Sequence, residues 1–202
     1  MAYRGTQQAL RALSAVAATQ GGYFTAQQAE GAGYRFNHLT YHVTRGNFER
    51  AGRGLYRIPT IPLSEHDDLI RLTLWSRGRD DVPQAVVSYG SALSLHELSD
   101  MLPGKVHLTV PQSFRRNAPA ECALHKANLT EKDSTAWGAF RVTTPLRTLV
   151  DVASDDSVPT EQLERAVRDA LERGLVAPAK LRAAAKAADP HSRLAKLVAG
   201  RS

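Results

Sequence analysis

The chain has 202 residues, of which 43% are hydrophobic and 23% are charged, and its formal net charge is +6. These proportions exclude wholesale disorder, and the length suits one domain or two small ones. No apolar run approaches the ~18 residues of a membrane-spanning helix, and the first residues do not resemble a signal peptide. Cys122 is the only cysteine, which excludes an internal disulfide and a cysteine-rich zinc site. We therefore expect a cytoplasmic protein with no membrane partner.

The positive charge is concentrated at one end of the chain. Residues 1–62 contain seven arginines and two glutamates, a net charge of +5, whereas the other 140 residues carry 19 basic and 18 acidic side chains. This asymmetry predicts two domains: a basic module over residues 1–62 that binds a polyanion, and a nearly neutral module over residues 63–202. The alternative is a solvated basic face without a partner.

Three helices are expected in the basic module. Apolar residues recur at helical spacing over residues 6–20, and Thr25 is a suitable N-cap for a short second helix that ends near Gly31. A third helix is expected over residues 35–45. Its inward stripe consists of Phe36, Leu39 and Val43. Two short helices joined by a glycine-bearing turn are typical of a helix-turn-helix.

A hairpin is expected directly after the third helix. Strand-like segments at residues 48–51 and 55–58 flank the sequence Gly52-Arg53-Gly54, which suits a tight turn with Arg53 at its tip. Together the three helices and this hairpin predict a winged helix-turn-helix, with Arg53 at the tip of the wing.

Basic and polar side chains mark the third helix and the hairpin as a DNA-binding surface. Arginine pairs bidentately with guanine and asparagine with adenine when a helix enters the major groove. We expect groove contacts from Arg35, Asn37, His38, Tyr41 and Arg45, and phosphate contacts from Arg50, Arg53 and Arg57. The alternative for Tyr41 is a half-buried packing role. His38 and His42 have the spacing of metal ligands, but no carboxylate or cysteine lies nearby, so we expect no metal site.

The second module is expected to be a mixed α/β domain that ends in a helical subdomain, which makes the chain an α/β (α+β) protein of two domains. Clean alternation at residues 105–110 predicts a strand, and Thr144-Pro145 is a typical helix start. Helices are expected at 63–77, 92–98, 145–152, 160–174, 178–188 and 193–198. Strands are expected at 85–87, 105–110, 123–125 and 140–143.

No catalytic residue, metal or cofactor is expected. Ser88, His96 and Asp100 are the residue types of a hydrolytic triad, but no Gly-x-Ser-x-Gly elbow surrounds the serine. The glycine-rich loops that bind nucleotide phosphates are missing as well. We therefore expect Ser88 to cap a helix and His96 to pack or face solvent.

Five segments in this order resemble the AbiEi family of antitoxins. They are residues 22–29 (GYFTAQQA), 53–59 (RGLYRIP), 87–98 (VSYGSALSLHEL), 106–111 (VHLTVP) and 142–151 (VTTPLRTLVD). The resemblance extends from about Thr6 to Leu175, and it depends on the order and spacing of these segments together.

The resemblance implies the antitoxin of a type IV toxin–antitoxin system. In such a system an N-terminal winged helix represses the operon by binding inverted repeats in the promoter. Two copies of the chain would then bind the double-stranded DNA, with possible dimerisation on it. A C-terminal domain counteracts a nucleotidyltransferase-like toxin. We expect toxin contacts from Arg141, Arg147, Arg165 and Arg168, with solvation or intramolecular pairing as the alternative for each.

Two other functions stay open at this point. One is a plain transcription regulator whose C-terminal domain senses a ligand or dimerises. The other is an enzyme that neutralises the toxin by covalent modification such as phosphorylation, with polar residues such as Ser88 or Asp151 taking part. The missing phosphate-binding loops weigh against the enzyme.

Overall fold

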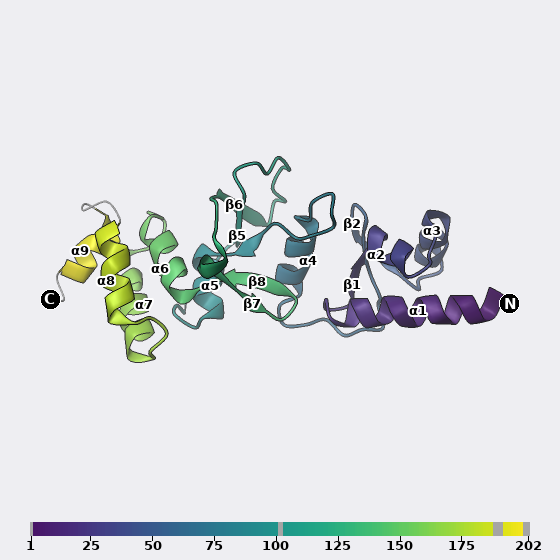
Figure 1. Ribbon diagram of the computed structural model, residues 1–202, viewed down its shortest axis with the longest axis horizontal. Coiled ribbons are helices and arrows are strands. Elements are labelled where there is room, and N and C mark those ends of the chain that lie inside the picture. Colours follow the sequence, from purple (N-terminus) through teal and green to yellow (C-terminus); the bar gives the residue numbers. More distant parts are fainter. Residues whose placement is uncertain (1, 101–102, 188–191, 200–202) are drawn as a thin grey trace. The chain divides into compact units, whose positions relative to one another are not determined.

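The computed structural model of the chain describes residues 2–100, 103–187 and 192–199 (Figure 1). Helices and strands are mixed, and the strands form two separate sheets, as expected for the α/β class. The chain divides into two compact units: Met1–Gln84 with Gly138–Phe140, and Ala85–Trp137 with Arg141–Ser202. Within the described ranges, no helix combines the length and the apolar character needed to cross a membrane.

The first unit consists of a helix, a strand, two helices, a hairpin and a further helix. These elements are α1 (Ala2–Ala18), β1 (Tyr23–Thr25), α2 (Ala26–Gly31), α3 (Phe36–Thr44), β2 (Glu49–Gly52), β3 (Leu55–Arg57) and α4 (Asp67–Trp75). The three expected helices and the hairpin all lie close to their expected positions. The strand β1 was not expected; it pairs antiparallel with β3, which makes β3 the middle strand of the sheet β1-β3-β2.

The core of the first unit is built around Phe24. Its fully buried ring meets Phe48 edge-on at 4.9 Å between centroids and stacks on Tyr56 at 5.6 Å. Leu13 of α1 and Leu39 of α3 close the same cluster, so α1 and α3 are held by their apolar faces and present their other faces to solvent. Phe36 was expected in this core, but its side chain lies outside the described part of the chain.

The helix α4 belongs to the first unit, although the boundary expected from the sequence falls before it, after residue 62. The proline-rich residues 58–62 have the composition of a linker, yet the chain folds back after them. The hydroxyl of Tyr23 in β1 donates a hydrogen bond of 2.7 Å to Asp67 at the start of α4. The first unit therefore continues to Gln84.

Arg77, just beyond α4, fastens the end of this helix to the hairpin turn. Its Nη2 donates to the carbonyl oxygens of Arg53 at 2.9 Å and Gly54 at 2.7 Å. Its Nε lies 2.9 Å from Oδ1 of Asp81, and Oδ2 of Asp81 accepts a hydrogen bond from Thr25, the N-cap of α2. Gly54 has φ +64°, which favours glycine, and a Cβ there would lie 3.0 Å from Nη2 of Arg77, so a side chain would also crowd this guanidinium.

The second unit contains a five-stranded mixed sheet in the order β6-β5-β4-β8-β7. Its strands are β4 (Val86–Val87), β5 (Val106–Val110), β6 (Cys122–Lys126), β7 (Ser134–Trp137) and β8 (Phe140–Thr143). β4 pairs antiparallel with β5 and parallel with β8, and β5 pairs parallel with β6. The four expected strands are confirmed. The polar edge strand β7 was expected to be part of a connection.

Five helices and one short 3-10 turn complete the described part of this unit. They are α5 (Tyr89–Leu95), η1 (Glu131–Asp133), α6 (Pro145–Ala153), α7 (Thr160–Glu172), α8 (Pro178–Ala187) and α9 (Arg193–Ala199). Thr144 accepts a hydrogen bond from the backbone of Arg147 and Pro145 occupies the first turn, so α6 begins as the sequence predicts. Ala188, the expected last residue of α8, lies outside the described residues.

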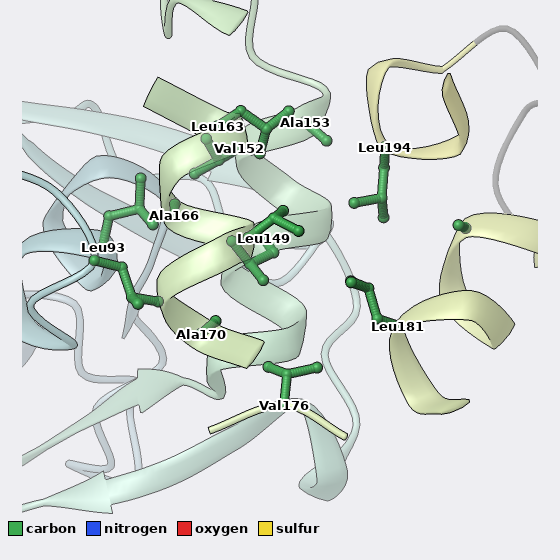
Figure 2. Close-up of a cluster of buried hydrophobic side chains, with 13 residues drawn as sticks. Leu93, Leu149, Val152, Ala153, Leu163, Ala166, Ala170, Val176, Leu181 and Leu194 are labelled. Carbon is green, nitrogen blue, oxygen red and sulfur yellow. The ribbon is translucent and has the colours of Figure 1, made fainter. Parts of the chain in front are cut away.

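A second core holds these helices together. Figure 2 shows Leu149 of α6 near the middle of the cluster, with Leu93 of α5 and Leu163 of α7 toward one side. Leu181 of α8 and Leu194 of α9 approach from the other side. All five side chains are at most 3% exposed, so the helical subdomain shares one apolar core with α5, which follows directly on the sheet.

A small cluster of polar rings lies next to α5. Tyr89, the first residue of this helix, has φ +49°, a backbone conformation that is strained for a residue with a side chain. Its ring stacks on His125 at 3.6 Å between centroids, and Nε2 of His125 lies 3.1 Å from Nδ1 of His107. Burial lowers the pKa of both imidazoles, although the nearby charge of Asp155 opposes this shift.

We expect Arg77→Ala to lower the free energy of unfolding by about 3 kcal/mol, because it leaves the largely buried carboxylate of Asp81 without its ion-pair partner. Arg79→Ala is the matched control, since Arg79 is exposed and its removal is expected to change stability by no more than about 0.5 kcal/mol. Urea denaturation of the full chain measures both values. Equal losses in the two variants would contradict the role given to Arg77.

Stability is also expected to depend on pH through the buried imidazoles. Burial lowers the pKa of His96, His107 and His125 in the folded chain, so below the ordinary value of about 6.5 the unfolded chain binds more protons. The contribution of these neutral imidazoles to the free energy of unfolding is therefore complete above about pH 6.5 and is lost as the pH falls below that value. Urea midpoints between pH 8 and pH 5 test this. The variant with both His107→Gln and His125→Gln is expected to show a shallower decline, and an unchanged slope would argue against this origin.

Candidate nucleic-acid interface

The five residues that were expected to contact a DNA groove lie on the exposed side of α3 or at its two caps. Leu39 is buried and anchors the helix, while Arg35 stands at its N-cap and Arg45 at its C-cap. The exposed residues on and beside the helix are Arg35, Asn37, His38, Tyr41 and Arg45. None of these side chains contributes to the buried core of the first unit. The helix therefore presents a polar and basic surface that folding does not require.

Tyr41 belongs to this surface and not to the core. Its side chain is 56% exposed, which decides against the half-buried packing role. The guanidinium carbon of Arg45 lies 5.5 Å from the centre of the Tyr41 ring, within the range of a cation–π contact. This contact holds the positive charge of Arg45 over an exposed aromatic face at the C-terminal end of α3.

The two histidines of α3 have separate roles. His38 is exposed, whereas the ring of His42 packs between Tyr34 and Phe48, and its Nδ1 lies 3.0 Å from Nδ2 of Asn47. Burial, followed by the charge of His38, lowers the pKa of His42. Across the described ranges, no group of three or more His, Cys, Asp or Glu side chains is placed to bind a metal ion.

The three arginines of the hairpin differ in their surroundings. Arg50 and Arg53 are exposed. Arg57 is only 8% exposed: its Nη1 lies 3.6 Å from Glu49, and its Nη2 donates to the carbonyl oxygen of Ile61. Its guanidinium is used inside the unit, so we leave Arg57 out of the interface. This burial was not predictable from the sequence, because Arg57 is enclosed on one side by the unexpected strand β1.

The acidic residues of the first unit do not cancel this basic surface. Residues 63–84 add five carboxylates and three arginines to the charges of the first 62 residues. All five carboxylates have partners within the unit. Asp67 accepts from Tyr23, and Asp68 and Asp81 pair with Arg71 and Arg77. Glu65 lies 3.5 Å from His66, and Asp80 accepts a hydrogen bond from the backbone of Val82. The local charge on α3 and the hairpin is therefore more informative than the net charge of the unit.

The four arginines expected to contact a toxin lie on three elements of the second unit. Arg141 on β8 is exposed and donates to Ser134. The other three form intramolecular ion pairs, which was their alternative role. Arg147 of α6 binds Asp151 at 2.8 Å, Arg165 of α7 binds Asp100 at 2.5 Å, and Arg168 of α7 lies 3.7 Å from Asp169.

Ser88, His96 and Asp100 do not form a triad. Ser88 is buried at the N-cap of α5 and accepts a hydrogen bond from Thr109. Nε2 of His96 lies 2.8 Å from the carbonyl oxygen of Thr143, and Asp100 is exposed and paired with Arg165. Burial raises the pKa of the Cys122 thiol to about 11, so this thiol is not activated as a nucleophile.

Comparison with known proteins finds two similarities. The fold resembles the crystal structure of the RV2827C protein from Mycobacterium tuberculosis, with a TM-score of 0.50 and 16% identity over 96% of this chain and 81% of that one. At this identity the likeness concerns the fold alone. No curated protein matches the chain. Residues 11–59 match the family described as "Transcriptional regulator, AbiEi antitoxin", which confirms the resemblance inferred from the sequence over the residues that contain α3 and the hairpin.

Proposed function

We propose that the first unit is a winged helix-turn-helix that binds double-stranded promoter DNA, and that the chain is an antitoxin that represses its own operon. The observation that carries this proposal is the face of α3, where five polar and basic side chains are exposed and none is needed for the core. The family match over residues 11–59 supports a regulator and antitoxin role. The order α1-β1-α2-α3-β2-β3 with sheet order β1-β3-β2 supports the winged-helix assignment.

In this proposal α3 enters the major groove and reads base edges. Arg35 and Arg45, at its two ends, carry the charge, and Asn37 is the side chain suited to bidentate pairing with adenine. Arg50 and Arg53 neutralise backbone phosphates beside the groove. One such unit reads one half-site, so inverted repeats take two copies of the chain, which meet at least on the DNA.

We assign neutralisation of a nucleotidyltransferase-like toxin to the second unit. The AbiEi resemblance of segments 87–98, 106–111 and 142–151 supports this assignment, because all three lie in that unit. No step of covalent chemistry is part of the proposal. Ser88 and Asp151, the residues considered for such a step, are at most 5% exposed.

Two substitutions separate base reading from phosphate binding. Asn37→Ala is expected to cost about 1–3 kcal/mol of binding free energy on the operator and to relax the preference at one base pair. Arg53→Ala is expected to weaken binding to all duplexes alike and to lower the slope of log K against log salt by about one. Fluorescence anisotropy with operator and scrambled duplexes at several salt concentrations measures both. Identical behaviour of the two variants would argue against α3 as the reading helix.

Arg57→Ala is the structural counterpart of Arg53→Ala. It removes a buried guanidinium from Glu49 and from the carbonyl oxygen of Ile61, so we expect a loss of about 2 kcal/mol in the free energy of unfolding. The salt slope of DNA binding by the folded variant is expected to equal that of the wild type. A slope lowered by about one would return Arg57 to the interface.

A growth assay tests the antitoxin role in the full chain. The adjacent gene is expressed from an inducible promoter, alone or with the wild-type chain or the variant Arg35→Ala/Asn37→Ala/Arg53→Ala. We expect both forms of the chain to restore growth, because neutralisation is assigned to the second unit. If the neighbour is toxic and neither soluble form restores growth, the chain is a plain regulator.

A further inference from the structure

A groove on the second unit combines an apolar floor with a basic rim. It lies among η1, α6 and α8, has a volume of about 500 Å³, and we call it the α6–α8 groove. Leu146 and Val150 of α6 and Ala184 of α8 form part of its floor. Lys132 and Lys180 stand at its rim on different elements. All of these residues belong to the second unit.

The charge at this rim is not neutralised by the rest of the unit. Lys132 and Lys180 are exposed, and neither forms an ion pair within the part of the chain that the structure describes. Asp133 is the acid that lines the groove, but it already accepts hydrogen bonds from the backbone and hydroxyl of Thr130 at 2.7 and 2.8 Å. These hydrogen bonds and Arg147 lower its pKa despite burial, so it stays ionised and engaged.

Arg147 lines the same groove, but its guanidinium is already paired inside the unit. Its Nε is bonded to Asp151, which is 5% exposed and lies one turn along α6, and its Nη1 lies 3.7 Å from Asp133. These two carboxylates hold the guanidinium in place from the protein side. The free positive charge of the groove therefore comes from two lysines on separate elements, Lys132 and Lys180, above an apolar floor.

We propose that the α6–α8 groove is the docking site for an acidic, amphipathic segment of the toxin. This rests on the proposed function, which assigns the toxin to the second unit. The floor takes apolar side chains, and the carboxylates beside them pair with Lys132 and Lys180. Of the four arginines considered from the sequence, Arg147 lines this groove.

The construction of the rim favours a protein segment over a small anion or a nucleic acid. A site for a small anion directs several fixed donors at one point, whereas the two free cations here are lysines, with long side chains, on separate elements. A nucleic-acid backbone gains nothing from a floor of leucine, valine and alanine. An acidic segment with apolar side chains uses both features.

The test uses the full chain and the purified toxin in isothermal titration calorimetry. Lys132→Glu/Lys180→Glu reverses the two free charges of the rim and is expected to weaken binding by at least about tenfold. Lys105→Glu/Lys126→Glu makes the same change in charge at exposed lysines of the same unit outside the groove, and it is expected to change affinity less than about twofold. Ala184→Phe fills the floor without altering charge and is expected to weaken binding as well.

Operator binding checks the first unit of each variant, and the thermal midpoint of the full chain checks that the second unit is folded. If the wild type binds the toxin and the groove variants bind it equally well, the groove proposal is overturned while the antitoxin role stands. If the wild type restores growth but does not bind the toxin, the groove proposal is also overturned and the antitoxin role also stands. If the wild type neither binds nor rescues, the proposed function falls as well. If inorganic phosphate or a nucleoside triphosphate binds saturably and this binding is lost in Lys132→Glu/Lys180→Glu, the groove binds a small anion and not a protein segment.

Discussion

The guanidinium of Arg77 fixes the hairpin of the first unit from outside the sheet. A two-residue turn exposes its carbonyl oxygens, and here those of Arg53 and Gly54 are both satisfied by Nη2 of Arg77. The same group is paired with Asp81, which is bonded to the N-cap of α2. The turn, the start of α2 and the end of α4 thus share one ionic centre. The position of Arg53 at the turn therefore depends on a residue 23 positions beyond Gly54.

Local patterns in the sequence were sufficient for the elements that carry the interface. The stripe containing Leu39 and Val43 predicts α3 and the face it exposes, and the glycines around Arg53 predict the hairpin. The burial of Arg57 was not predictable in this way, because it follows from the pairing of Tyr23 with Arg57 across the sheet. Contacts at such separations leave no periodic signal in either segment.

The position of the domain boundary was likewise not predictable from local patterns in the sequence. The two prolines over 58–62 are typical of linkers, and a shift in charge at this point supports that interpretation. The hydrogen bond from Tyr23 to Asp67 nevertheless joins segments on both sides of it. Likewise, the near neutrality of residues 63–202 conceals a local basic rim. Lys132 and Lys180 are 48 positions apart in the sequence and line one groove only after η1 and α8 have packed.

The composition of α8 explains how the chain maintains this groove. The helix reads PAKLRAAAKA, and its buried residues are Leu181 and Ala185. Alanine has the highest intrinsic helix propensity because its side chain loses no rotamer entropy on folding. A helix rich in alanine stays helical without large apolar side chains on every face, so those beside the groove can remain small. The helix propensity of its alanines thus stabilises α8 without large side chains packed beside the α6–α8 groove, so leaving the groove open costs little stability.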